Sequence, residues 1–289
     1  MNKNLNIINS YKKKIVLGTA QFGKVYGINN QNKKRIRKEQ IRQIIKTLKK
    51  NGAKHIDNAE SYFFDLKHLK DYKIIIDTKI EINKKNSDIK NIQKIINKYL
   101  IKKNLKLDTI YLHNPEMIFS DYGKKIFKNL IEFKKKKKFK NIGISVYDLT
   151  VLKKIISKYD IDAVQLPYNI LDRRFENYFK TLVKKKIKIN IRSIFLQGAL
   201  IPRFNNKISQ KPEIKKFLNF IKRKKLNKMK YCLGFVAKKK FINKIIVGVD
   251  NFYQLNEILN IKFKKDYLTS FNFSSSNLNI IDPRFWNKI

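Results

Sequence analysis

The sequence contains few residues that cross-link a chain or interrupt its secondary structure: its 289 residues include one cysteine, five prolines and nine glycines, and also a single tryptophan. A single cysteine, Cys232, excludes a disulfide framework and fits a reducing compartment. No Pro-rich linker, internal repeat or low-complexity boundary divides the chain. Its length can bury a large core, which suits one α/β barrel or two smaller domains.

Long apolar runs are also missing. The first 14 residues lack the uninterrupted apolar core of a signal peptide, and no segment approaches the ~20 apolar residues that a membrane span needs. We therefore expect a soluble, cytoplasmic protein without a membrane span.

Negative charge is scarce, with 22 acidic residues against 67 Lys and Arg and a formal net charge of +45. Such a balance ordinarily indicates a polyanionic partner. Only nine of the 67 are Arg, however, and the lysines occur on nearly every expected helix and turn instead of forming one stripe. The abundance of Ile, Asn and Lys is typical of an AT-rich genome. We expect salt-dependent, nonspecific adhesion to polyanions and no specific nucleic-acid partner.

Short apolar runs alternate with longer amphipathic segments, a rhythm that indicates βα units around a parallel sheet. The expected strands are Lys14 to Gly18, His55 to Asn58, Lys73 to Lys79, Thr109 to His113, Asn141 to Ser145, Ala163 to Pro167, Lys188 to Ser193 and Ile245 to Gly248. The expected helices are Glu39 to Lys50, Ile89 to Lys103, Gly123 to Lys137, Leu149 to Lys158, Phe175 to Lys184, Ile214 to Lys239 with a break, and one from Tyr253.

Eight such units in about 250 residues favour a single-domain (β/α)8 TIM barrel over an open doubly wound sheet. We expect the barrel to occupy residues 1–260. Residues 261–289 then form a C-terminal tail that packs on or over the barrel.

Four polar residues follow successive strands at the face where such barrels carry their active sites. Asp57 ends the second expected strand, Tyr62 lies in the loop after it, Lys79 ends the third and His113 ends the fourth. Each also has an ordinary structural interpretation, as a turn former, a surface lysine or a core histidine. Their joint placement favours a site.

The chain resembles the aldo-keto reductase family across roughly residues 13 to 260. The matching stretches are Leu17-Gly18-Thr19-Ala20-Gln21-Phe22-Gly23, Asp57 to Tyr62, Thr78-Lys79, Leu112-His113-Asn114-Pro115, Gly143-Ile144-Ser145, Val164-Gln165-Leu166-Pro167-Tyr168-Asn169 and Ile246-Val247-Gly248-Val249. The resemblance implies a catalytic tetrad of Asp57, Tyr62, Lys79 and His113, acting on a small-molecule carbonyl substrate with NADP or NAD.

The chemistry explains these residue types. A carbonyl that accepts hydride at carbon develops negative charge on oxygen, so a proton donor must stand within hydrogen-bond reach. We expect Lys79 to lower the pKa of Tyr62, Asp57 to keep Lys79 charged, and His113 to hold the substrate oxygen. The cofactor supplies the hydride.

The resemblance also implies cofactor contacts: Ser145 and Gln165 at the nicotinamide carboxamide, and the loop from Gly248 to Gln254 at the adenosine phosphate. Where an aromatic residue often stacks on the nicotinamide, this chain has Arg192, whose guanidinium plane can also stack. Asp250, Asn251 and Gln254 stand where basic residues bind a 2′-phosphate. A carboxylate repels that phosphate and can accept ribose hydroxyls, so the choice between NADP and NAD stays open.

Strand alternation predicts a second inward polar layer. His55, Asp77 and Tyr111 each lie two residues before Asp57, Lys79 and His113, and so share their side of the strand. We expect Asp77 either to compete with Asp57 for Lys79 or to reinforce it. An outward-facing Asp77 is the alternative.

Two features leave the function open. Only 17 positions separate Tyr62 from Lys79, so the second crossover has a short helix, and the usual Asn after the serine is replaced by Val146. The chain is therefore an oxidoreductase, or a nicotinamide-binding sensor or partner subunit without turnover, or a basic nucleic-acid-binding barrel. We expect the rim to include Tyr147, Tyr168, Arg173 and the loop from Gly198 to Pro212, whose Arg203 and Lys207 favour an anionic substrate. The oligomeric state is not predicted.

Overall fold

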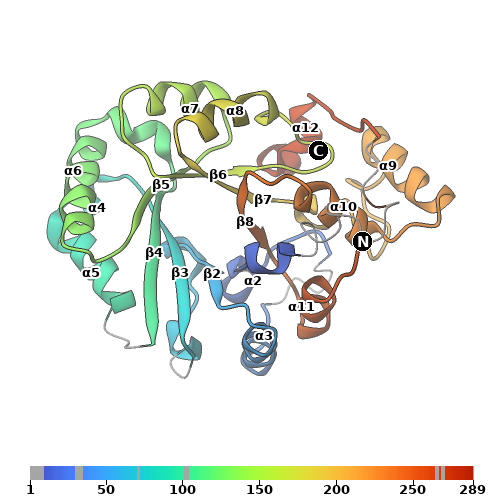
Figure 1. Ribbon diagram of the computed structural model, residues 1–289, viewed down its shortest axis with the longest axis horizontal. Helices are drawn as coiled ribbons and strands as arrows, with labels where there is room; N and C mark the ends of the chain where they lie inside the picture. Colours follow the sequence, from blue (N-terminus) through green and yellow to red (C-terminus); the bar gives the residue numbers. More distant parts are fainter. Residues whose placement is uncertain are drawn as a thin grey trace.

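The computed structural model describes residues 10–29, 35–69, 72–100, 104–263, 267 and 271–288. Within these residues, parallel strands close a barrel in chain order (Figure 1). The strands are β1 (Ile15–Gly18), β2 (His55–Asp57), β3 (Ile74–Ile80), β4 (Leu105–Leu112), β5 (Asn141–Ser145), β6 (Ala163–Pro167), β7 (Lys188–Arg192) and β8 (Ile242–Val247). The predicted (β/α)8 barrel is confirmed, with β5 and β6 at their predicted bounds.

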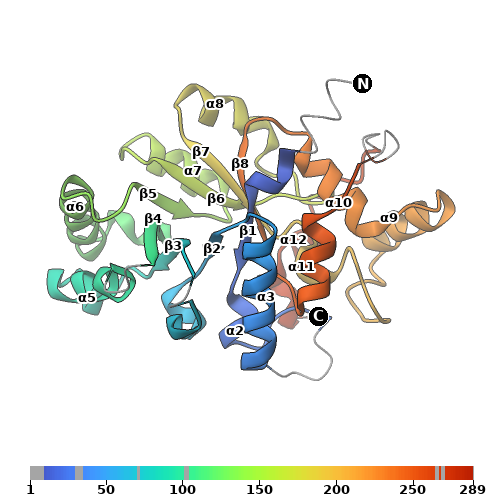
Figure 2. The ribbon, with the colours of Figure 1, turned by 60° about the horizontal axis from the view of Figure 1, so that its bottom comes forward.

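Helices surround the barrel on its outside, and α3 runs beside α11 (Figure 2). The α-helices are α2 (Ala20–Gly23), α3 (Lys38–Lys50), α4 (Lys84–Ser87), α5 (Ile89–Leu100), α6 (Asp121–Lys135), α7 (Leu149–Ile156), α8 (Phe179–Lys184), α9 (Pro212–Arg223), α10 (Lys228–Ala237), α11 (Phe252–Leu259) and α12 (Leu278–Ile281). The last three residues of the predicted helix Ile89 to Lys103 lie outside the described residues. The predicted break after Ile214 is confirmed between α9 and α10.

The pattern of apolar residues accounts for this arrangement. Strands such as β5 and β6 are buried along their whole length, as a sheet covered on both faces requires. Helix α3 buries Ile41, Ile44, Ile45 and Leu48, spaced three to four residues apart, and points its charged residues at solvent. The lysines of α3 thus lie on the outside of the barrel.

The connection from β2 to β3 differs from the prediction of a short helix. Its described residues form only the 3-10 turns η2 (Glu60–Tyr62) and η3 (Leu66–Leu69), with no α-helix. Phe63 adopts a left-handed conformation, with φ of 55°, and turns the chain after Tyr62. Phe64 then packs edge-on against Phe22 of α2, with ring centroids 5.1 Å apart. This contact ties the short loop to the barrel.

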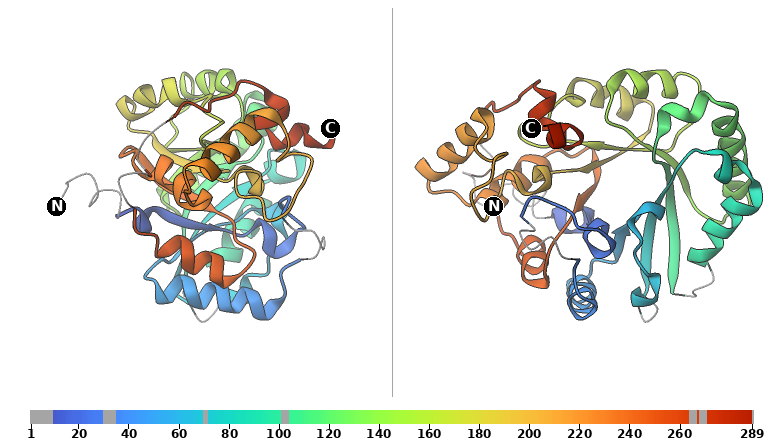
Figure 3. Two further views of the ribbon diagram at one scale, coloured as in Figure 1. Left: turned by 90° about the vertical axis from the view of Figure 1, so that its right-hand side faces the viewer. Right: turned by 180° about the vertical axis from the view of Figure 1, so that it is seen from behind.

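The C-terminal segment returns along the connection that follows β6 (Figure 3). Ser275 N donates a hydrogen bond of 2.9 Å to Leu171 O, and Arg174 Nη1 lies 3.1 Å from Asp282 Oδ2. The 3-10 helix η8 (Pro283–Lys288) follows α12. The division of the chain at residue 260 stays a prediction. Among the helices described, none combines the length and the apolarity that a bilayer crossing requires.

Candidate active site

Asp57 ends β2 with both carboxylate oxygens bound inside the barrel. Lys79 Nζ donates to Oδ2 at 2.5 Å, and Gln165 Nε2 donates to Oδ1 at 2.7 Å. The three residues come from β2, β3 and β6 and are each at most 3% exposed. A buried charge is tolerated only when it is paired and hydrogen-bonded. Asp57 and Lys79 therefore act as one nearly neutral unit.

Tyr62 covers this ion pair from η2, with Lys79 Nζ 5.3 Å from its ring centroid. Burial raises the pKa of Tyr62 above its ordinary value; the Asp57 carboxylate raises it further, and Arg192 opposes the change. The prediction that Lys79 lowers this pKa is wrong, because Asp57 binds the ammonium and cancels most of its field. Tyr62 accordingly keeps its proton at neutral pH, as a proton donor must.

His113 directly follows β4, the neighbour of β3 in the barrel. Burial lowers its pKa to about 4, and the cations Lys79, Arg192 and Lys24 add to that effect. Its Nδ1 lies 3.9 Å from Glu81 Oε1. At neutral pH the imidazole is uncharged and offers one N–H donor and one acceptor. The four residues predicted as a tetrad thus border one region at the carboxyl ends of β2, β3 and β4.

A cleft with an empty volume of about 890 Å³, its open mouth included, extends from Asp57 and Tyr62 to Gly248, Asp250 and Gln254. The loops after β1 and β7 meet along it, since Ile28 N donates to Gln197 O at 3.1 Å. The cleft therefore joins the predicted catalytic end to the predicted cofactor loop.

The cofactor loop itself is tightly hydrogen-bonded. Asp250 N donates to Gln254 Oε1 at 2.7 Å, and Arg203 Nη1 lies 3.6 Å from Asp250 Oδ2. Asn251 caps α11 by accepting from Gln254 N at 3.0 Å, and it does not line the cleft. Of the predicted loop contacts, Gly248, Asp250 and Gln254 face the cleft, and Arg203 places a cation beside the carboxylate.

Ser145 and Gln165, predicted at the nicotinamide carboxamide, are register partners on β5 and β6; both are buried, and neither lines the cleft. Gln165 Oε1 has no hydrogen-bond partner although it is buried. An unpaired buried acceptor is costly unless a ligand or water satisfies it. A primary carboxamide has an N–H donor of the kind that this acceptor lacks, and the contact with a nicotinamide stays a prediction.

Arg192, predicted to stack on the nicotinamide, lines the cleft and stacks on a protein ring. Its guanidinium carbon lies 3.9 Å from the Tyr147 ring centroid, and its Nη2 donates to Val146 O at 3.3 Å. Tyr147 covers one face of the Arg192 guanidinium plane, and the opposite face can still contact a ligand. Stacking on a cofactor therefore stays a prediction.

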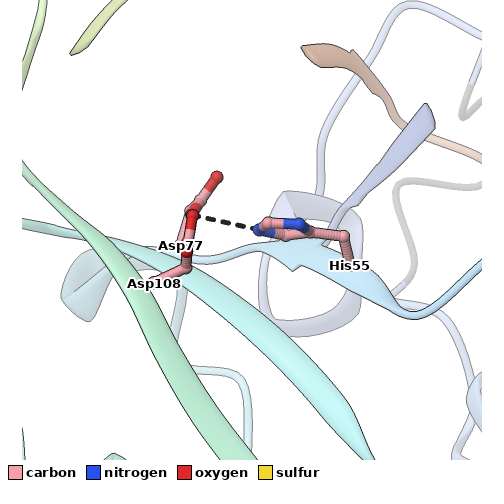
Figure 4. A group of neighbouring side chains, drawn as sticks. All are labelled: His55, Asp77 and Asp108. Atoms are coloured by element: carbon pink, nitrogen blue, oxygen red, sulfur yellow. Dashed lines mark ion pairs between the residues drawn. The ribbon is translucent and has the colours of Figure 1, made fainter. Parts of the chain in front are cut away.

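A second polar cluster lies deeper in the barrel, where His55 and Asp77 point toward one another beside Asp108 (Figure 4). Lys244 Nζ lies within 2.9 Å of both carboxylates and 3.2 Å from His55 Nε2. Side chains from β2, β3, β4 and β8 can meet only inside the barrel, so the inward direction of Asp77 is confirmed. Its predicted contact with Lys79 is wrong, because Lys244 and His55 are its partners.

Tyr111, the third predicted member of this layer, accepts a hydrogen bond of 2.6 Å from Asn190 Nδ2 on β7. Its ring occupies the space that a side chain at Gly143 would need, since a Cβ there would lie 2.5 Å from it. Tyr111 therefore faces the interior as predicted.

The predicted rim is confirmed only for Gly198 and Ile201 of the loop from Gly198 to Pro212. Tyr168 is fully buried and donates to Glu176 Oε1 at 2.6 Å, and Arg173 lies over the Phe235 ring. The other residues predicted at the rim by name do not line the cleft either: Tyr147, Arg203 and Lys207. Residues not predicted do line it: Gln21, Tyr26 and Gln197. Tyr26 lies in the loop that follows β1, at the carboxyl ends of the strands. This position after a strand was the only feature of the sequence that could have identified Tyr26 as a cleft residue.

Gly23 fixes the loop that carries Tyr62. A Cβ on Gly23 would lie 1.8 Å from Tyr62 O, a backbone atom that cannot yield without moving the loop. We expect Gly23→Ala to lower kcat/KM at least ~10-fold, because small displacements of a catalytic group are costly. Gly52→Ala is the control, since its φ of 72° makes alanine strained although no atom lies within 4 Å. Equal losses in both variants would contradict the positional role of Gly23.

His113 should make stability depend on pH. Its pKa is about 4 in the folded protein against 6.5 ordinarily, so the unfolded chain binds the proton more tightly. The contribution of neutral His113 to the free energy of unfolding is fully present above pH ~6.5. It falls by about 2 kcal/mol as the pH drops toward ~4, after allowance for the partial exposure of the side chain. Urea unfolding of the wild type and His113→Gln between these pH values measures it. Parallel profiles for the two proteins would refute it.

Comparisons with known proteins agree with this geometry. The model of the Aldo/keto reductase family matches residues 14–269. No curated protein sequence matches significantly. The chain is similar in structure to the holo form of the aldo-keto reductase AKR11C1 from Bacillus halodurans, with a TM-score of 0.70 and 17% identity over 88% of this chain and 89% of that one.

Two further solved structures are similar to it. Aldose reductase from Giardia lamblia gives a TM-score of 0.65 and 15% identity over 95% of this chain and 97% of that one. The glycerol dehydrogenase AKR11B4 from Gluconobacter oxydans gives 0.63 and 15% over 88% of each chain. At these identities the likeness concerns the fold.

Proposed function

This chain belongs to the aldo/keto reductase family, whose members are oxidoreductases that use a nicotinamide cofactor, and we propose that it reduces a small carbonyl compound with Tyr62 as the proton donor. The observation that carries this proposal is the buried Asp57–Lys79 pair of 2.5 Å beneath the Tyr62 ring. Burying the charges of Asp57 and Lys79 inside the barrel has a large desolvation cost, which their mutual attraction and hydrogen bonds must offset.

In the proposed mechanism, a nicotinamide cofactor, when bound, would supply the hydride that the carbonyl carbon accepts. Tyr62 donates its phenolic proton to the oxygen as negative charge develops there. Neutral His113 donates an N–H hydrogen bond to the same oxygen and sets its direction. The charge of Arg192, which acts to lower the pKa of Tyr62, stabilises the phenolate that remains, and the Asp57–Lys79 pair holds the Tyr62 ring in place.

The chain's residues also offer partners for both ends of the cofactor. Gln165 Oε1 offers its unpaired acceptor to the carboxamide, with Ser145 beside it, and Asp250 and Gln254 face the adenosine portion. Asp250 favours the ribose hydroxyls of NAD, whereas Arg203 at 3.6 Å favours the 2′-phosphate of NADP. The proposal therefore covers both cofactors, and the assay must include both.

A nicotinamide-binding sensor without turnover is the second candidate, and the raised pKa of Tyr62 favours it. A phenol that holds its proton tightly transfers it with less driving force. In this case the cleft binds the cofactor and the carbonyl is not reduced.

Oxidation of NADH and NADPH over a panel of aldehydes, ketones and sugars separates the two candidates. Turnover with any of these carbonyls supports the reductase, provided that Tyr62→Phe abolishes most of it. Binding of the cofactor without turnover on the whole panel supports the sensor.

A further inference from the structure

Arg192 brings a positive charge to the cleft wall without a carboxylate of its own. Among the described residues it forms no ion pair, and its one hydrogen bond goes to Val146 O. Two buried carboxylates of the region are bound by other cations: Asp57 by Lys79 at 2.5 Å and Asp172 by Arg174 at 2.9 Å. The Arg192 charge is therefore left to act on whatever enters the cleft.

The guanidinium of Arg192 is also held in place. The carbon atoms of the Arg192 and Arg284 guanidinium groups lie 3.9 and 3.8 Å from the centroid of the same Tyr147 ring. Two groups that close to one centroid would overlap on a single face, so they must cover opposite faces. Arg284 is itself bound by Asp282 at 2.7 and 3.0 Å. The C-terminal segment thus completes a stack that ends at Arg192.

Arg192 and Tyr62 border the same end of the cleft, and the charge of Arg192 acts on the Tyr62 phenol. Hydride must reach a carbonyl carbon whose oxygen Tyr62 protonates. The redox-active ring consequently lies within a few bond lengths of Tyr62 and close to the Arg192 wall, whichever way the rest of the cofactor runs.

We propose that Arg192 selects the reduced nicotinamide over the oxidised one. Loss of a hydride, two electrons and a proton, converts the neutral dihydronicotinamide into a positively charged pyridinium. A fixed like charge beside the ring disfavours only the second form. The inference rests on the proposed function and adds a direction to it: the cleft favours carbonyl reduction and weak retention of the oxidised product.

Dissociation constants of the reduced and oxidised forms of one nucleotide test the proposal without any turnover. Tryptophan or nicotinamide fluorescence serves for the reduced form and calorimetry for both. In the wild type we expect the oxidised form to bind at least ~10-fold more weakly than the reduced form, because two like unit charges in contact repel appreciably even at an effective dielectric constant of ~20. Arg192→Gln, planar and neutral, should reduce this ratio by about 10-fold.

Two further variants identify the cause. Arg192→Lys keeps the charge and should keep most of the ratio. Arg203→Gln removes a cation beside Asp250 at the opposite end of the cleft and should change both affinities by the same factor. A ratio that is unchanged in Arg192→Gln overturns the inference while leaving the reductase proposal intact. Failure of the reduced form to bind the wild type contradicts both.

Discussion

Replacing Tyr62 with Phe is expected to lower kcat by about 10²- to 10⁴-fold, which is the usual contribution of a positioned general acid. The phenylalanine ring keeps the packing over Lys79, whose Nζ lies 5.3 Å from the ring centroid, and removes only the hydroxyl. Cofactor affinity and stability should therefore change little. Steady-state kinetics with a carbonyl substrate, beside cofactor titration, measures the two effects separately.

Tyr26→Phe is the matched control for this substitution. Tyr26 is a second phenol that lines the same cleft, and its hydroxyl interacts with Gln197. Its loss should change kcat by less than ~10-fold because the proposed mechanism assigns it no proton transfer. If Tyr26→Phe caused the large loss and Tyr62→Phe the small one, the proton donor would be wrongly assigned.

Replacing Lys244 with Met should destabilise the folded protein by about 3–5 kcal/mol, the cost of removing one partner of a buried ion pair. Asp77 is fully buried, and Lys244 binds its carboxylate at 2.7 and 2.9 Å as well as Asp108 at 2.9 Å. Without the ammonium, Asp77 keeps only the His55 imidazole at 3.1 Å. Chemical denaturation at neutral pH measures the loss.

Lys134→Met makes the same chemical change in a more exposed pair. Lys134 lies 2.6 Å from Asp162, but about a third of each side chain is accessible to solvent. The expected loss there is about 1 kcal/mol or less. The double variant Lys244→Met with Asp77→Asn should recover part of the stability, because the unpaired buried charge is gone. The deep cluster consists of His55, Asp77, Asp108 and Lys244. Equal losses of stability in Lys244→Met and Lys134→Met would show that this cluster does not stabilise the fold as we infer.

The sequence predicted the barrel and the end at which its site lies because both depend on local patterns. A strand buried on both faces reads as a short apolar run, and β5 and β6 match their predicted bounds for this reason. The predicted Asp57–Lys79 contact needed only two adjacent strands and their shared carboxyl end. Boundaries were less accurate where charged residues interrupt a strand, as at Lys106 in β4 and Lys244 in β8.

The deep cluster could be predicted only in part, because strand irregularities place two of its members. Strands β3 and β4 shift register between Ile76 and Asp77, and Asp108 has no register partner on β3. A second shift, between Ile189 and Asn190, pairs Asn190 with Lys244 and leaves out Asn243. Strict alternation along a strand does not anticipate such shifts, which re-aim side chains. The Arg284–Tyr147–Arg192 stack was missed because it joins three segments that lie about 45 and about 90 residues apart in the sequence.

Stopped-flow mixing of the preformed protein–cofactor complex with an excess of carbonyl compound tests the central claim most directly. The reductase account predicts that one equivalent of bound NADH or NADPH is oxidised in a single turnover, and that Tyr62→Phe slows this step by about 10²-fold or more while binding the cofactor equally well. Stoichiometric cofactor binding with no oxidation by any carbonyl, or oxidation at the same rate in Tyr62→Phe, would contradict it.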